Sequence, residues 1–169
     1  MDATRFFTTM ASPLGSVRLT SSGRILTGLY LEKFGGQTIA APDPGWKHEV
    51  EPFDEIVVQL REYFAGPRRQ FGVPLAGAGT VFQQRVRDVL MDIPFGETRS
   101  YGEIAWALGQ PSAARAVGMA SGRNRFFIIV PCHRVLGAGG ALTGYGGGLE
   151  RKRWLLAHEA AAAAAAAVE

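Results

Sequence analysis

Pro131-Cys132-His133-Arg134-Val135 stands between an apolar run, residues 126–130, and a glycine-rich stretch, residues 137–148. Cys132 is the only cysteine among the 169 residues. A strand-like apolar run that leads into a glycine-rich loop places the sulfur where it can react. Most free cysteines are small core residues, however, so the stretch alone leaves both interpretations open.

The single cysteine excludes an intramolecular disulfide framework and is typical of a reducing cytosol. Only His48, His133 and His158 could join Cys132 at a metal, and their spacing matches no common zinc pattern. We therefore predict no metal site and no cofactor. The sequence has no signal-like segment and no apolar run of membrane-spanning length, which predicts a cytoplasmic protein without membrane contact.

Positive charge is concentrated around the cysteine. Residues 99–153 carry eight Lys or Arg, Arg134 and Lys152 among them, against two Glu, a net charge of +6, whereas residues 1–76 are neutral. Such a field favours a polyanion such as nucleic acid. A solvated basic face explains the same charge equally well.

The first part of the chain predicts an α/β unit over residues 1–76. β-branched and aromatic residues between turn signals predict antiparallel strands at residues 5–10, 16–21 and 25–31. Apolar residues at helical spacing predict a helix over 54–64, which Gly66-Pro67 ends. Residues 71–75 are predicted to form one more strand, and Ala76-Gly77-Ala78-Gly79 marks the boundary.

The rest of the chain predicts a mainly helical unit. Thr80 with Gln83, and Ser100 with Glu103, are capping boxes that open two helices. After the turn Gly109-Gln110-Pro111, Ser112 is predicted to cap a third helix over 113–121. Two short helices joined by a tight turn indicate a helix-turn-helix, although ordinary helical hairpins share the pattern.

The third helix is built almost entirely from small residues, and Arg115 is its only long charged side chain. A smooth helix of this kind can approach another surface closely. A close-packed core helix explains the alanines equally well but gives Arg115 no purpose.

The last helix is predicted to run from Leu149 to at least Glu159. Glu159 shares a face with Leu155 and Leu156, and a buried carboxylate needs a partner, for which His133 is the obvious candidate. A solvent-facing Glu at a helix end is the alternative.

The helices predicted after the boundary at residues 76–79 make up the second domain, residues 77–159. Residues 160–169 are predicted as an alanine-rich tail.

Cys132, His133 and Glu159 could act as nucleophile, base and orienting carboxylate. Since Cys132 and His133 are neighbours in sequence, a bridging water is expected between them. The two partners are predicted to lower the pKa of the thiol. The arrangement suits alkyl transfer, acyl transfer or a cysteine hydrolase.

The sequence resembles the O6-alkylguanine-DNA alkyltransferases over roughly residues 80–159. The resemblance is carried by Ile129-Val130-Pro131-Cys132-His133-Arg134-Val135, Thr143-Gly144-Tyr145-Gly146-Gly147-Gly148 and Arg151-Lys152-Arg153-Trp154-Leu155-Leu156-Ala157-His158-Glu159. It implies a ribonuclease-H-like N-terminal domain and a C-terminal domain with a winged-helix-like helix-turn-helix. It also implies a monomeric DNA repair protein, and it leaves cooperative binding along DNA open.

The resemblance implies the role of each site residue. Cys132 accepts the alkyl group irreversibly from O6 of guanine, or O4 of thymine, in double-stranded DNA. His133 acts through water as its base, Glu159 orients the histidine, Asn124 is a hinge, and Tyr101 donates to guanine N3. Arg115 replaces the flipped nucleotide. DNA is contacted further by Ser100, Tyr101, Ala113, Ala114, Gly118, Met119 and Arg123, and the alkyl pocket is formed by Val130, Val135, Tyr145, Gly146, Gly147 and Gly148.

This chain departs from the family pattern at two positions. Arg125 follows Asn124 where proline is usual, and Gly146 stands where some members have serine. Two alternatives stay open: a lesion sensor that binds alkylguanine without reacting, and the cysteine hydrolase. The sensors of this family carry another residue in place of the cysteine, so Cys132 argues against the first.

Overall fold

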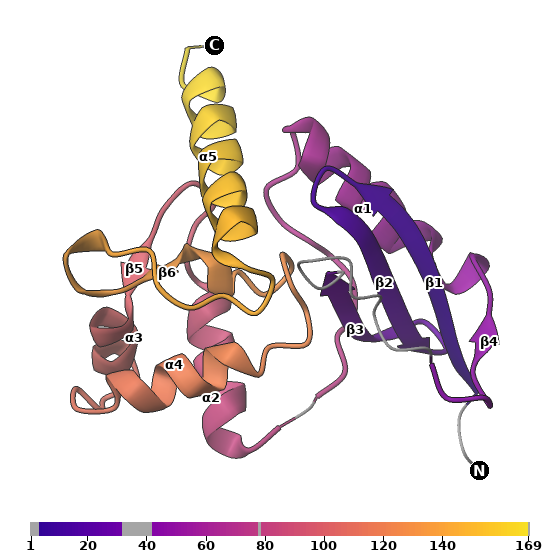
Figure 1. Cartoon of the computed structure of the whole chain (residues 1–169), viewed down its shortest axis with the longest axis horizontal. Coiled ribbons are helices and arrows are strands. Elements are labelled where there is room, and N and C mark those ends of the chain that lie inside the picture. The colour runs from indigo at the N-terminus through magenta and orange to yellow at the C-terminus, as the bar shows by residue number, and fades with distance from the viewer. Residues whose placement is uncertain (1–3, 32–41, 78, 169) are drawn as a thin grey trace. The chain divides into compact units, whose positions relative to one another are not determined.

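The computed structural model describes residues 4–31, 42–77 and 79–168. The chain divides into two units, Met1–Ala76 and Gly77–Glu169 (Figure 1). The elements of the first unit are β1 (Arg5–Ser12), β2 (Gly15–Ser22), β3 (Ile25–Leu31), β4 (Lys47–His48), η1 (Glu51–Phe53) and α1 (Asp54–Ala65). The three predicted strands and the predicted helix are therefore present.

The first unit is a four-stranded sheet in the order β3-β2-β1-β4 with one long helix. β1 pairs antiparallel with β2, and β2 with β3, as the two tight turns predict, while β4 joins β1 in parallel. Val17, Leu19 and Leu29 of the sheet are fully buried. α1 buries Leu60 and Tyr63, and it ends at Gly66, whose φ of 111° suits glycine.

The predicted strand at residues 71–75 is wrong. Its only ladder contact among the described residues is an isolated bridge between Leu26 and Leu75. Two backbone hydrogen bonds hold the segment there, from Leu26 N–H to the Pro74 carbonyl and from Ala76 N–H to the Leu26 carbonyl. Pro74 cannot donate to a ladder, which explains why the pairing does not extend.

The second unit is mainly helical. Its elements are α2 (Val81–Met91), β5 (Arg99–Ser100), α3 (Tyr101–Ala107), α4 (Ala114–Gly122), η2 (Cys132–Arg134), β6 (Val135–Leu136), η3 (Ala138–Gly140) and α5 (Leu149–Ala166). Both capping boxes form as predicted, at Thr80 and at Ser100. The predicted cap of α4 is wrong, because Ala113 occupies that position and makes no side-chain capping bond.

A short parallel pairing brings two distant segments together. β5 pairs with β6, so that Arg99 lies opposite Val135 and Ser100 opposite Leu136. Tyr101 follows β5 directly, and η2 with Cys132 precedes β6. The pairing therefore holds the start of α3 beside the cysteine segment.

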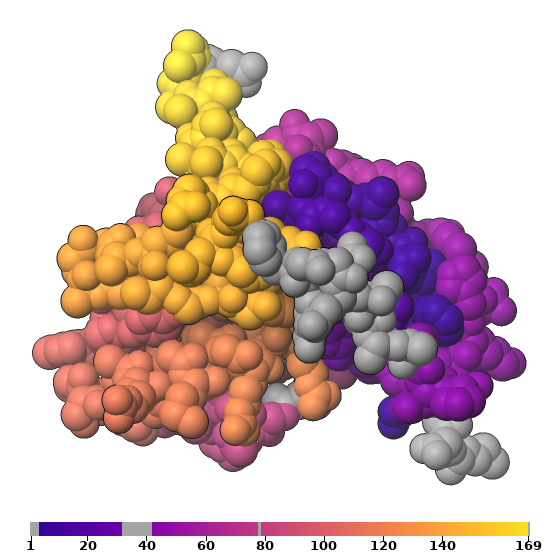
Figure 2. Space-filling view, viewed as in Figure 1, coloured from indigo at the N-terminus to yellow at the C-terminus, as the bar shows by residue number. Residues whose placement is uncertain are grey.

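The alanine-rich tail continues α5 without a break. The helix runs to Ala166, and its C-terminal end projects from the rest of the second unit (Figure 2). Gly96, at a φ of 80°, packs against this helix so closely that an added Cβ would lie 3.0 Å from Ala163 Cβ. The first turns of the tail thus have a packing role.

Candidate active site

Cys132 is buried at the start of η2, directly after the apolar segment 126–130, and is 5% exposed. Its backbone N–H donates to the Val130 carbonyl at 2.8 Å. Its Sγ accepts a hydrogen bond from Asn124 Nδ2 at 3.1 Å. The sulfur is therefore fixed in direction and protected from bulk water.

Asn124 ties the segment after α4 to the cysteine. Its Nδ2 also donates to the Val130 carbonyl at 3.0 Å, and its Oδ1 accepts from the Phe126 backbone N–H at 2.9 Å. One side chain thus holds both ends of the apolar segment. Within that segment Ile128 has a φ of 74°, which is unfavourable for a β-branched residue and which these bonds help to maintain.

The thiol of Cys132 is less acidic than the sequence suggests. Burial raises the pKa of Cys132, and the Asn124 hydrogen bond and the positive charge of Lys152 lower it by less. The expected lowering of this pKa is therefore wrong in its net direction: the backbone of His133 does lower it, but burial outweighs every such contribution, and the thiol form predominates in the free protein. A base must take the proton as the sulfur reacts.

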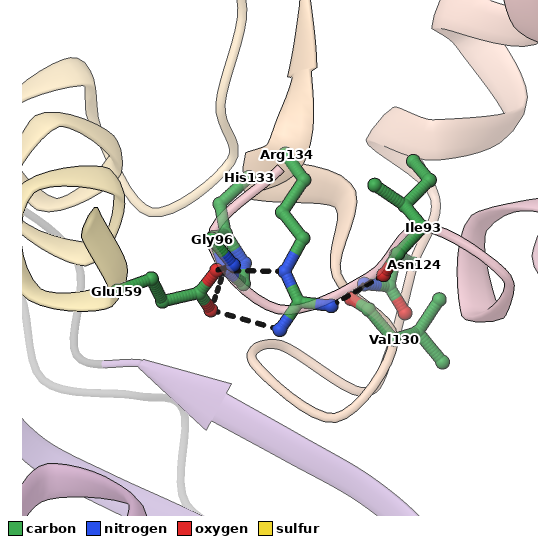
Figure 3. A network of polar contacts seen from close by, with 7 residues as sticks. All are labelled: Ile93, Gly96, Asn124, Val130, His133, Arg134 and Glu159. Atoms are coloured by element: carbon green, nitrogen blue, oxygen red, sulfur yellow. Dashed lines mark hydrogen bonds and ion pairs between the residues drawn. The ribbon is translucent and has the colours of Figure 1, made fainter. Parts of the chain in front are cut away.

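His133 is fully buried and bonded to Glu159. Its Nε2 lies 2.7 Å from Glu159 Oε1, and its Nδ1 has no hydrogen-bond partner among the described residues (Figure 3). Burial lowers the pKa of His133 despite the opposing effect of Glu159, so the ring is neutral. If Nε2 donates its hydrogen to the carboxylate, Nδ1 carries the lone pair that accepts a proton.

No direct hydrogen bond joins Cys132 to His133 in the described structure. Figure 3 shows the His133 ring beside Glu159 and the Asn124 amide near Val130. The Cys132 sulfur is bonded to Asn124 and the His133 ring to Glu159, so the two neighbouring side chains have different partners. It fits the expectation that a water carries the proton between them.

Arg134 does not lie on a basic surface, as its place among the positive charges of residues 99–153 would suggest. It is buried, and it contacts both oxygens of Glu159, with Nε at 2.8 Å from Oε2 and Nη2 at 2.9 Å from Oε1. Its Nη1 donates to the Ile93 carbonyl at 2.7 Å. The Gly96 backbone N–H also donates to Glu159 Oε2, at 3.2 Å. Burial would raise the pKa of Glu159, but the bonds from His133 and Arg134 outweigh it and hold that pKa far below its usual range.

Lys152 is a second buried cation. Its Nζ donates to the carbonyls of Val135, Thr143 and Gly144, at 2.5, 2.8 and 3.3 Å. Burial lowers the pKa of Lys152, and the neighbouring Cys132 raises it. Arg134 and Lys152 are therefore not part of a basic surface, although their sequence positions suggest one. They are buried and stabilise the active-site loops.

Two tyrosines lie near the sulfur. Burial raises the pKa of Tyr101 and, more strongly, that of Tyr145, and a charge on Cys132 raises both further. Both are therefore neutral phenols. The ring of Tyr145 packs edge-on against Phe127, with centroids 5.4 Å apart.

Phe127 also explains the glycine at position 146. A Cβ added to Gly146 would lie 3.0 Å from Phe127 Cζ, so a serine there would require the ring to shift. Gly147 is buried and Gly148 half-buried beside it. Gly146, Gly147 and Gly148 therefore follow Tyr145 directly and add no side chain beside its ring.

The predicted DNA-contacting residues divide by exposure. Arg115, Met119 and Arg123 are exposed on α4 or at its end, while Ala113, Ala114 and Gly118 are half-buried. Gly118 faces Tyr101: a Cβ there would lie 3.7 Å from the ring. The Ser100 hydroxyl accepts from the Glu103 backbone N–H, so this side chain is already used as the cap of α3.

In the described part of the chain no group of three His, Cys, Asp or Glu could hold a metal. No helix there is long and apolar enough to cross a membrane.

The fold and the site define a protein with one buried cysteine nucleophile beside a neutral histidine and an anchored carboxylate, carried by a helical unit that follows a sheet unit. Known proteins share this succession of two units. Residues 6–76 match the 6-O-methylguanine DNA methyltransferase ribonuclease-like domain, and residues 81–161 match the DNA binding domain of the same proteins. The chain belongs to the 6-O-methylguanine DNA methyltransferase family, which confirms the resemblance.

Relatives and solved structures match over nearly the whole chain. A methylated-DNA–protein-cysteine methyltransferase of Mycobacterium leprae is 53% identical over 147 residues, 87% of each chain. The crystal structure of the Mycobacterium tuberculosis O6-methylguanine methyltransferase matches with a TM-score of 0.85 at 50% identity, covering 93% of each chain. A structure of the M. tuberculosis protein in complex with DNA matches with a TM-score of 0.85 at 49% identity, covering 93% of this chain and 94% of that one.

The buried ion pair of Arg134 with Glu159 predicts a large loss of stability on substitution. Replacing Arg134 by Met removes two hydrogen bonds and a positive charge from the buried carboxylate, and breaking such a pair typically costs about 3–5 kcal/mol. Urea unfolding measures the change. Arg153→Met removes an exposed Arg of the same helical unit as a control and should shift stability by no more than about 0.5 kcal/mol. Equal effects of the two substitutions would contradict the proposed anchoring role.

The same network predicts how stability depends on pH. The folded pKa values of His133 and Glu159 lie below their ordinary values of 6.5 and 4.5. The unfolded chain therefore binds more protons in these windows, and stability falls as pH drops below about 6.5 and falls again below about 4.5. Urea unfolding from pH 8 to pH 3 measures both steps. The lower step should shrink in Glu159→Gln; an unchanged lower step would assign it to other groups.

Proposed function

We propose that this protein repairs DNA by transferring methyl or larger alkyl groups from O6 of guanine, and from O4 of thymine, to its own Cys132. The observation that carries the proposal is the buried Cys132 thiol beside a neutral His133 that Glu159 holds. Residues 77–159 bind the DNA and carry the reaction. Each molecule acts once, because a thioether has no ready hydrolytic route back to a thiol.

The chemistry balances with the residues of the site. The Cys132 sulfur attacks the alkyl carbon, an S–C bond forms, and the C–O6 bond breaks with its electron pair going to O6. The thiol proton passes through water to His133 Nδ1. The neutral phenol of Tyr101 donates a proton to the guanine ring, and the proton taken up by His133 returns through water to the Tyr101 oxygen. In net terms one alkyl group moves from O6 to the Cys132 sulfur, and one proton moves from the thiol to guanine.

Burial of the sulfur requires the target base to leave the helix. Cys132 is 5% exposed, so a base stacked within a duplex could not reach it, and enzymes that act on such bases extrude them. We assign α3 and α4 as the helix-turn-helix, with α4 entering the minor groove. Its small side chains allow the close approach that this groove demands.

Arg115 is assigned the space that the extruded nucleotide leaves, because it projects from the exposed face of α4. Unstacking costs a few kcal/mol, so Arg115→Ala should slow repair of duplex DNA by about 10- to 100-fold. Transfer from a free alkylated guanine base, where no stack must open, should change far less. The measurement is the ratio of the duplex rate to the free-base rate in wild type and in the variant. An unchanged ratio would mean that Arg115 is only a surface charge and does not replace the extruded nucleotide.

The two alternatives find less support. A hydrolase that forms an acyl-enzyme needs backbone donors for an oxyanion, and the Cys132 N–H is already bonded to the Val130 carbonyl. A pure lesion sensor needs no nucleophile, yet the site is organised around one.

Following the removal of O6-methylguanine from a duplex tests the function. The amount removed should equal the amount of protein added and should not grow with time. A hydrolase would leave the lesion untouched, and a sensor would bind the duplex without changing it.

A further inference from the structure

A cavity of about 330 Å³ lies in the helical unit. It opens between α2, the end of α4 and the segment that follows α4. Its lining includes Asn124 but neither Cys132 nor Tyr145. Asn124 therefore lies between the reactive sulfur, to which it donates, and this cavity.

Three arginines are among the residues that line the cavity: Arg87, Arg123 and Arg125. Among the described residues no Asp or Glu lines it, and the lining also includes the apolar side chains of Leu90 and Phe126. Arginine pairs with phosphate through two parallel N–H bonds, and several arginines around one hollow without a carboxylate favour an anion.

The position of the cavity indicates where the anion comes from. Arg115, Met119 and Arg123 are exposed and spaced four residues apart, so they share one face of α4 or its extension. Eight residues of helix span about 12 Å. With Arg115 in the groove of a duplex, Arg123 at the other end of this face would reach the sugar-phosphate backbone beside it.

We propose that this cavity binds one phosphate of the DNA backbone, held by Arg125 and Arg123 on one side and by Arg87 of α2 on the other. The proposal rests on the DNA-repair function proposed above and names an additional contact for it. Arg125 is the distinctive member, since it occupies the position where the family usually has proline. The phosphate would also fix the segment containing Asn124, and with it the amide that contacts the sulfur.

The salt dependence of DNA binding tests the proposal. The logarithm of the binding constant falls with the logarithm of salt concentration by about 0.9 for each phosphate contacted. Arg125→Gln should reduce this slope by about 0.9 on undamaged duplex, and Arg125→Lys should retain most of it. Arg61→Gln, which removes an exposed charge from α1 of the other unit, should leave the slope unchanged.

Two further variants separate a cavity-bound phosphate from a general surface charge. Arg87→Gln combined with Arg125→Gln should lower the slope by about 0.9 in total, because both arginines hold the same phosphate. Ala120→Leu fills the cavity without changing any charge and should lower the slope as well. Additive losses in the double variant, or an unchanged slope in Ala120→Leu, would overturn the cavity site.

The source of the anion is tested with inorganic phosphate and a mononucleotide. If either binds wild type with an affinity that Arg125→Gln abolishes, while the DNA slope stays unchanged, the cavity holds a free anion and the proposal is wrong. Methyl transfer to Cys132 from saturating O6-methylguanine duplex is measured in the same variants. If methyl transfer persists and the salt dependence of DNA binding is the same in all variants, the phosphate site is contradicted and the repair function is not. If wild type transfers no methyl group, the repair function itself is contradicted.

Discussion

Replacing His133 by alanine is expected to slow alkyl transfer by about 10²–10⁴-fold, the usual cost of losing a proton-transfer partner. The reason is that burial raises the pKa of the Cys132 thiol, so the sulfur depends on a base at the moment of reaction. Glu159→Gln should slow the reaction too, because the amide weakens the bond that orients the ring. DNA binding should change little in either variant.

The measurement is the single-hit alkylation rate across pH, on a duplex and on a free alkylated base. In wild type the rate should fall as His133 becomes protonated below its already lowered pKa. His133→Ala should lose this fall and should instead depend on hydroxide at alkaline pH. Arg153→Ala serves as a control for removing an exposed side chain of α5. Equal rates and profiles in wild type and His133→Ala would remove histidine from the mechanism.

Cys132→Ala is expected to abolish transfer while the fold and binding to O6-methylguanine DNA persist. The small side chain occupies the same buried position, and Asn124 keeps its bonds to the Val130 carbonyl and the Phe126 backbone N–H. The variant should therefore behave as a lesion-binding protein. Binding by gel shift and transfer of a labelled methyl group measure the two properties separately, and any labelled protein in this variant would place the acceptor elsewhere.

Local patterns could be predicted from the sequence because their causes lie within a few residues. The two capping boxes each depend on residues three apart, and the hairpins depend on adjacent turn signals. The pairing of Glu159 with His133 could be expected as well, since a carboxylate on the apolar face of a helix needs a partner.

Features that depend on distant contacts could not be predicted in this way. Arg134 and Lys152 belong by sequence to the positive charge around the cysteine, yet both are buried and donate to backbone carbonyls, and Arg134 also contacts the distant carboxylate of Glu159. The raised pKa of Cys132 likewise comes from burial, which sequence spacing does not reveal. The strand predicted at residues 71–75 does not form for a similar reason. A strand needs a neighbouring strand to pair with, and the sequence of the segment does not show whether one is there.

The intact mass of the protein after incubation with excess O6-methylguanine duplex tests the central claim most directly. The account predicts that each chain gains the mass of one methyl group, that peptide mapping places it on Cys132, and that the gain stops there however long the incubation lasts. The mass should not change with undamaged duplex. Unmodified protein after the lesion has disappeared, or methylation at another residue, would contradict the account.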